Sequence, residues 1–114
     1  MTDRTPEFQS ISAEALAREP SGYTLVDVRR RARYDEAAGV LPGARYGDPE
    51  RVADWAAGLP KGKPVVVYCV HGYEISQGVA ALLRGRGHEV RHLTGGYDDW
   101  VAAGRPIQAK DRQP

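Results

Sequence analysis

The sequence predicts an α/β domain built around a mainly parallel β-sheet, and three observations carry that prediction. The chain has 114 residues, the usual length of one compact domain. Short runs rich in β-branched residues alternate along it with runs typical of helices, which favours parallel strands joined by helices. The strongest run, Val65–Cys69, is apolar without alternation and predicts a central strand covered on both faces. We therefore expect helices on both sides of the sheet, within a single domain spanning residues 1–114.

In the N-terminal half, capping and helix-breaking residues set the expected boundaries. Ser12 has the side chain of an N-cap, and Pro-Ser-Gly at residues 20–22 stops the helix that follows it. A turn-rich passage begins at Gly39 and includes a Pro-Gly pair. Asp48 before Pro49 is a favourable cap and first position for another helix. The expected elements are helices over residues 13–18, 30–37 and 49–57 and a buried strand over residues 24–28.

In the C-terminal half, glycine and proline again separate the expected elements. Val79, Leu82 and Leu83 supply the apolar face of a helix that ends near Gly85. A Gly-Gly pair at residues 95–96 turns the chain into the last helix. The expected elements are strands over residues 65–69 and 90–93 and helices over residues 75–86 and 97–103. We expect the core to span about residues 7–107, with polar, frayed tails over residues 1–5 and 109–114.

Composition excludes several classes of protein. Lys and Arg number 16 against 15 Asp and Glu, so nothing predicts a nucleic acid or an anionic membrane as a partner. The longest apolar run, around residues 65–68, is far shorter than the ~20 residues of a membrane span. The N-terminus lacks the apolar core of a signal peptide, so we expect a cytoplasmic protein. The one cysteine excludes an internal disulfide and a cysteine-based zinc site.

That cysteine stands where the central strand is expected to meet a helix. Ligands of open parallel sheets bind beyond the carboxyl ends of the strands, where Cys69 is expected to lie. The N-terminus of the following helix favours an anion, either a thiolate or a bound oxyanion. Gly72 allows the tight curvature that such a loop needs. The pattern predicts a nucleophile facing an anionic electrophile, although a lone cysteine is also often a small buried hydrophobe.

Four motifs in order carry a resemblance to the rhodanese-like family. Leu25–Arg29 resembles the family's Asp-x-Arg strand, and Gly39–Ala44 resembles its Gly-His-Ile-Pro-Gly-Ala turn, with Val40 in place of histidine. Residues 95–100 resemble its Gly-Gly-x-x-x-Trp signature, and Cys69 stands at the position of the family's active cysteine, with the loop glycine matched as well. The resemblance covers about residues 7–107 and implies a three-layer sandwich with a central five-stranded parallel sheet.

The resemblance also implies a reaction. Cys69 would attack the outer sulfur of thiosulfate or of a persulfide donor and would carry the sulfur as a persulfide. A thiophilic acceptor, either cyanide or a thiol, would then take the sulfur; a protein is a further acceptor to consider. The family's chemistry implies no metal and no organic cofactor. Two other functions stay open: a cysteine-dependent phosphatase or arsenate reductase, and a non-catalytic module that binds proteins.

The loop after the cysteine departs from the family pattern. Family members that transfer sulfur typically place a small residue at the start of the helix after six loop residues, whereas Ser76 stands one place later. We expect a seven-residue loop, Cys69–Ile75, with Ser76 beginning the helix. The phosphatase and arsenate-reductase relatives close such a longer loop with an arginine that clamps the anion. Ile75 occupies that place, which argues against their chemistry.

Other residues are assigned by their position near the cysteine. Asp27 and Arg29 are expected to form a structural polar pair beneath the loop, while Trp55 and Trp100 are expected to be core or cap aromatics. Arg29 and Arg33 are candidates to flank the mouth of the pocket and bind an anion. The remaining candidates for substrate binding are the loop residues Val70, His71, Gly72, Tyr73, Glu74, Ile75 and Ser76.

Overall fold

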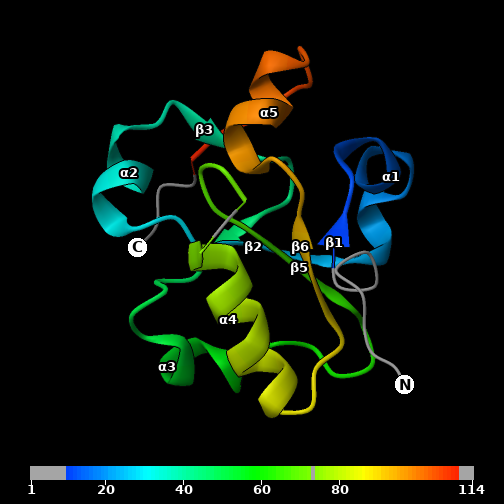
Figure 1. Cartoon of the computed structure of the whole chain (residues 1–114), viewed down its shortest axis with the longest axis vertical. Coiled ribbons are helices and arrows are strands. Elements are labelled where there is room, and N and C mark those ends of the chain that lie inside the picture. The colour runs from blue at the N-terminus through cyan, green and yellow to red at the C-terminus, as the bar shows by residue number, and fades with distance from the viewer. Residues whose placement is uncertain (1–9, 73, 111–114) are drawn as a thin grey trace.

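The computed structural model describes residues 10–72 and 74–110 and contains the predicted five-stranded parallel sheet. The strand order is β1-β6-β5-β2-β4, with β5 at the centre, and every pairing in this sheet is parallel (Figure 1). Three strands match the expected runs, and two-residue strands complete the edges. The strands are β1 (Ser10–Ile11), β2 (Thr24–Asp27), β4 (Arg45–Tyr46), β5 (Val65–Tyr68) and β6 (Val90–Leu93).

Helices cover both faces of this sheet, as the uninterrupted apolar run in β5 predicts (Figure 1). On one face, α1 (Ala13–Arg18) and α5 (Gly96–Ala102) contribute Leu16 and Trp100 to a buried cluster with Leu25. On the other face, α3 (Val52–Ala56) and α4 (Glu74–Gly85) pack on Val65 and its neighbours. Cys69 belongs to the α4 side of the sheet. The predicted three-layer sandwich is therefore confirmed.

Local hydrogen bonds explain where α1 begins and why α3 begins later than predicted. The Ser12 side chain accepts a hydrogen bond from Ala15 N at 3.0 Å, which caps α1, and a short 3₁₀ helix, η2 (Pro20–Gly22), follows α1. The prediction that a helix begins at Pro49 is wrong. The Asp48 carboxylate accepts from Glu50 N at 2.9 Å and its carbonyl accepts from Arg51 N at 3.0 Å. These bonds close a turn ahead of the helix.

The C-terminal segment is ordered further than predicted. β3 (Gly39–Val40), expected as part of a turn, pairs antiparallel with β7 (Gln108–Ala109), expected as part of a frayed tail. The Lys110 ammonium donates to two carbonyls of α2 (Arg31–Glu36), Tyr34 O at 2.9 Å and Asp35 O at 3.0 Å. Local sequence patterns do not predict the pairing of β3 with β7, because its hydrogen bonds join segments that are far apart in the chain. Among the described ranges, no helix has the length and apolar character needed to cross a membrane.

Candidate functional site

Cys69 lies directly after β5, where the sheet opens toward the N-terminus of α4. Its side chain is nearly buried, with 5% of the residue exposed. The sulfur lies 3.2 Å from the Oγ of Ser76, which is fully buried in the first turn of α4. A thiol can donate to that hydroxyl, and a thiolate can accept from it. The Ser76 hydroxyl can therefore form a hydrogen bond with the sulfur whether Cys69 is a thiol or a thiolate.

The helix after the cysteine begins earlier than predicted. α4 starts at Glu74, so the prediction that Ser76 begins the helix and that the loop runs through Ile75 is wrong. Two preferences favour the earlier start: an acidic residue in the first turn complements the helix dipole, and Ile75 gains contact with the core cluster under α4. β5 correspondingly ends at Tyr68, one residue before the predicted boundary.

The first turn of α5 holds the loop from Cys69 to Gly72, called the cysteine loop below. Tyr97 N donates to Cys69 O at 2.9 Å, and Asp98 N donates to Val70 O at 3.0 Å. The described chain has no cis peptide bond, and in a trans peptide the N–H points away from the carbonyl. The N–H groups of Val70 and His71 therefore point away from the first turn of α5.

Two glycines allow this close contact between the cysteine loop and α5. Gly72 has φ +84° and Gly96 has φ +61°, values that favour glycine. A Cβ at Gly96 would lie 2.5 Å from Cys69 O and 2.6 Å from Val70 O, and a Cβ at Gly72 would lie 2.8 Å from Gly95 N. The Gln77 side chain adds a bond to Gly72 O at 3.1 Å. Gly96, the second residue of the Gly-Gly pair, thus has two roles: it begins α5, and its lack of a side chain leaves room for the cysteine loop.

A buried ion pair lies behind the loop. Arg29 Nε donates to both carboxylate oxygens of Asp27 at 3.0 Å, and its Nη2 donates to the same carboxylate and to Gly39 O. The guanidinium also lies 4.0 Å from the centre of the Tyr97 ring. Burial by itself lowers the pKa of Arg29, but the hydrogen bond and charge of Asp27 raise it on balance. The structural role predicted for Asp27 agrees with this packing.

Arg29 lines the cavity that contains Cys69, described below, but its side chain is not free to bind an anion there. Only 2% of the residue is exposed, and its donors are engaged by Asp27 and Gly39. Tyr68 extends the same network, because its hydroxyl donates to Asp27 at 3.0 Å and accepts from Leu41 N at 3.1 Å. Burial and the neighbouring Asp27 charge raise the pKa of Tyr68 far above its usual range, which keeps the hydroxyl neutral.

An open cavity of about 450 Å³ contains the cysteine at its wall. Several predicted residues do line it, and one arginine that was not predicted joins them. Gly72 and Ser76 are buried and not part of this lining, and Tyr73 lies outside the described residues. The lining residues are Arg29, Arg30, Arg33, Cys69, Val70, His71, Glu74 and Ile75.

Cationic side chains from α2 lie at this cavity. Arg33 is exposed, as predicted for the mouth, and its guanidinium lies 3.5 Å from the Glu36 carboxylate. Arg30 is the N-cap residue of α2 and is also exposed, and no ion pair joins it to another of the described residues. Arg30 was not among the candidate site residues predicted from the sequence. Its position directly after the Asp-x-Arg motif was a signal that could have placed it at the site.

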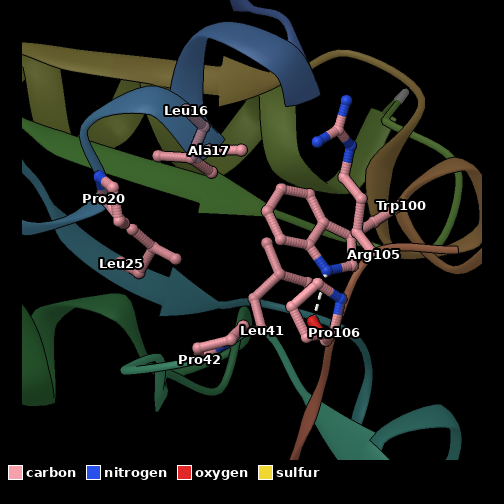
Figure 2. A pocket seen from close by; sticks show the side chains of 9 residues that line it. All are labelled: Leu16, Ala17, Pro20, Leu25, Leu41, Pro42, Trp100, Arg105 and Pro106. Atoms are coloured by element: carbon pink, nitrogen blue, oxygen red, sulfur yellow. Dashed lines mark hydrogen bonds between the residues drawn. The ribbon is translucent and has the colours of Figure 1, made fainter. Parts of the chain in front are cut away.

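A second cavity lies on the α1 and α5 side of the sheet and differs in chemistry. It measures about 130 Å³ and is lined almost entirely by apolar side chains, with Arg105 at one edge (Figure 2). Trp100 forms one wall, and its indole Nε1 donates to Pro106 O at 2.8 Å (Figure 2). Cys69 does not line this cavity. This apolar cavity offers no nucleophile or acid–base group, so the candidate site is the larger cavity that contains Cys69.

Comparison with known proteins identifies the family. The family model for the rhodanese-like domain matches residues 12–103. The chain belongs to the rhodanese-like domain family. It is 37% identical to the thiosulfate sulfurtransferase GlpE of Pseudomonas putida strain GB-1 over 99 residues, covering 84% of this chain and 87% of that relative. It is also 35% identical over 105 residues to an HTH-type transcriptional regulator of Mycobacterium tuberculosis, covering 90% of this chain and 46% of the regulator.

Solved structures of rhodanese-like proteins share the fold. A rhodanese-related protein of Thermoplasma volcanium superposes with a TM-score of 0.79 at 24% identity, covering 89% of this chain and 98% of that one. The Alr3790 protein of Anabaena gives a TM-score of 0.75 at 30% identity, covering 88% and 80%. A Rhodopseudomonas palustris protein described as a possible tyrosine phosphatase gives 0.74 at 22% identity, covering 95% and 97%. Such likenesses establish the rhodanese-like fold.

Proposed function

We propose that this rhodanese-type sulfurtransferase transfers a sulfane sulfur through a persulfide on Cys69. One observation carries the proposal: Cys69 lies at the wall of an open cavity while α5 binds the carbonyls of the cysteine loop, so that the N–H groups of Val70 and His71 point away from α5. A covalent sulfur carrier needs a nucleophile that a small anion can reach and donors that stabilise negative charge. The similarity to thiosulfate sulfurtransferases supports the same reaction class.

The first half-reaction is a displacement at sulfur. The Cys69 thiolate attacks the outer sulfur of thiosulfate, the bond between the two thiosulfate sulfurs breaks, and sulfite leaves with the electron pair. The product is a persulfide whose outer sulfur carries the negative charge. In the second half-reaction a thiol or cyanide takes this outer sulfur and Cys69 leaves as a thiolate. The two steps restore the enzyme, so the kinetics are of the ping-pong type.

The residues around Cys69 have distinct tasks in these steps. The backbone N–H groups of Val70 and His71 stabilise the persulfide charge, because their orientation is held by α5 before the reaction begins. The Ser76 hydroxyl, 3.2 Å from the sulfur, stabilises the thiolate before attack and again after it leaves. Glu74 and Ile75 line the cavity without adding a donor for an anion.

Phosphatase or arsenate-reductase chemistry is less well supported by this site. An enzyme that holds a tetrahedral oxyanion in such a loop needs a cation that clamps it bidentately. Ile75 stands where that arginine would be, and Arg29 is buried in its pair with Asp27. The remaining cations, Arg30 and Arg33, come from exposed positions on α2. Such positions suit recruitment of an anion better than a fixed clamp.

Incubation of the reduced protein with thiosulfate should add one sulfur atom to Cys69. Intact-mass measurement should show a gain of about 32 Da, the mass of the covalently bound sulfur expected for nucleophilic catalysis. Cyanide should remove the gain, and Cys69→Ser should not show it, because the chain has no second cysteine. A protein that gains no sulfur from thiosulfate or from a small persulfide would contradict the proposed function.

Arg30→Ala should raise KM for thiosulfate about threefold to fivefold with little change in kcat, as expected for an exposed charge worth up to about 1 kcal/mol. The effect should shrink as salt concentration rises, because salt screens exposed charges. Arg31→Ala is the matched control, since it removes the same charge from the neighbouring residue, which does not line the cavity. Equal KM changes in both variants would show that Arg30 acts only through net charge.

A further inference from the structure

His71 and Asp98 form a pair at the mouth of the cysteine site. The His71 Nδ1 lies 3.4 Å from Asp98 Oδ2, with both side chains more than half exposed. His71 lines the cavity that contains Cys69, and it also lines an adjoining cavity together with Asp98. Both groups are therefore reachable from solvent at the place where an acceptor must enter.

The backbone fixes this pair relative to the sulfur. His71 is two residues after Cys69 in the cysteine loop, and Asp98 N donates to Val70 O at 3.0 Å. The same turn of α5 therefore holds the loop and carries the carboxylate beside the imidazole. The separation of 3.4 Å is long for a hydrogen bond, but contacts of catalytic pairs commonly shorten when substrate binds.

We infer that His71, oriented by Asp98, is the base that takes the proton from an incoming thiol acceptor. This inference rests on the proposed persulfide. When Nδ1 carries the proton and faces Asp98, Nε2 is left as a proton acceptor, and the carboxylate stabilises the imidazolium that forms. His71 is then a catalytic residue of the second half-reaction, and Asp98 is a positioning residue that acts through it.

The step balances without an oxidant or a reductant. The thiol loses its proton to His71 Nε2, and its sulfur forms a bond to the outer sulfur of the Cys69 persulfide. The bond between that outer sulfur and Cys69 Sγ breaks, and Cys69 leaves as a thiolate beside the Ser76 hydroxyl. The product is a small persulfide, and the proton on His71 passes to solvent or to that product. Sulfite has no thiol proton to lose in mildly alkaline solution and does not need this base.

Other charged groups also lie near His71. Acidic side chains that share its cavities come from α2, α4 and α5, and cationic side chains come from α2 and the end of β2. His92 of β6 shares a third cavity with His71. Of these groups, Asp98 alone forms an ion pair with His71 within the described part of the chain, which makes its removal a direct test. The acids are Glu36, Glu74, Asp98 and Asp99, and the cations are Arg29, Arg30 and Arg33.

The test separates the two half-reactions. Wild type, His71→Gln, Asp98→Asn and the control Asp99→Asn are first loaded with sulfur from thiosulfate and checked by intact mass. Each persulfide is then mixed rapidly with 2-mercaptoethanol or with sulfite, and loss of the sulfur is followed over a range of pH. The Asp99 variant makes the same change of charge on the neighbouring residue of α5, which shares a cavity with His71 but forms no ion pair with it among the described residues.

The ratio of the rate constants for 2-mercaptoethanol and sulfite should fall about 100-fold in His71→Gln, the lower end of general-base catalysis. It should fall about tenfold in Asp98→Asn, which keeps the imidazole but loses its orienting charge. The histidine-range limb of the thiol pH profile should vanish in His71→Gln, and Asp99→Asn should match wild type. An unchanged ratio in sulfur-loaded His71→Gln would overturn the role inferred for His71 but not the proposed persulfide on Cys69. A wild-type protein that cannot be loaded with sulfur would instead overturn the proposed function.

Discussion

Gly96→Ala should lower the rate of persulfide formation about 100-fold, the cost of displacing a reacting group by roughly 1 Å. The added Cβ would lie 2.5 Å from Cys69 O and 2.6 Å from Val70 O, and neither backbone atom can move without moving the cysteine loop. The positive φ of 61° adds strain for alanine. Single-turnover sulfur transfer from thiosulfate, followed by intact mass, measures the effect directly.

Gly78→Ala is the matched control for that variant. Gly78 is exposed in α4, and a Cβ there would meet no heavy atom within 4 Å. Alanine should stabilise this helix position by about 0.5–1 kcal/mol and leave sulfur transfer near the wild-type rate. If Gly96→Ala transferred sulfur as fast as Gly78→Ala while remaining folded, the contact between α5 and the cysteine loop would not position the nucleophile.

Asp27→Asn should destabilise the protein by about 3–5 kcal/mol, the usual cost of removing one partner from a buried ion pair. The carboxylate accepts bonds from the Arg29 backbone and side chain and from the Tyr68 hydroxyl, and both acidic and basic partners are almost fully buried. The variant removes the negative charge that compensates the buried guanidinium and replaces one of the two acceptor oxygens on Arg29 with an amide donor. Urea unfolding followed by circular dichroism measures the free energy of unfolding.

Asp54→Asn provides the comparison for a surface pair. Asp54 lies 3.2 Å from Arg51, and both side chains are about two-thirds exposed, so its loss should cost less than about 1 kcal/mol. Adding Arg29→Met to Asp27→Asn should recover part of the stability, because the uncompensated charge is then gone. Similar losses for the Asp27 and Asp54 variants would contradict the view that the buried pair supports the fold behind the site.

The central strands could be predicted from the sequence because each is a run of four or five residues with a clear apolar pattern. β5 and β2 are buried at every position, and this burial produces the uninterrupted apolar run of β5 and the apolar pair Leu25-Val26 at the centre of β2. β1 and β4 have two residues each and carry no such signal. These short strands form because they pair with the exposed edges of the longer strands β6 and β2. Their own residues therefore do not predict them, since the partner strand lies elsewhere in the chain.

The same division applies to the site. Cys69 and the residues after it are consecutive, so a strand followed by a helix was enough to place them together. Asp98 and Gly96 reach the site through the path of the chain across β6, and no local pattern links them to residue 70. The pairing of Arg29 with Asp27 could be predicted because the two residues are only two places apart, but the sequence does not show that this pairing buries the guanidinium almost completely. The start of α4 was misjudged because the dipole and packing preferences of Glu74 and Ile75 act against the shift inferred from the motif.

The near-complete burial of Cys69 bears on which of two sulfurs an acceptor can attack. A second sulfur on Cys69 extends the reactive end by about 2.05 Å, the length of a sulfur–sulfur bond, toward the open cavity. The inner sulfur remains against Ser76 with 5% of the residue exposed. Attack there would expel hydrosulfide and leave the enzyme blocked as a mixed disulfide. In the proposed persulfide, the packing around Cys69 would expose the outer atom and shield the inner one, which would impose regioselectivity and protect the enzyme from inactivation by its own acceptor.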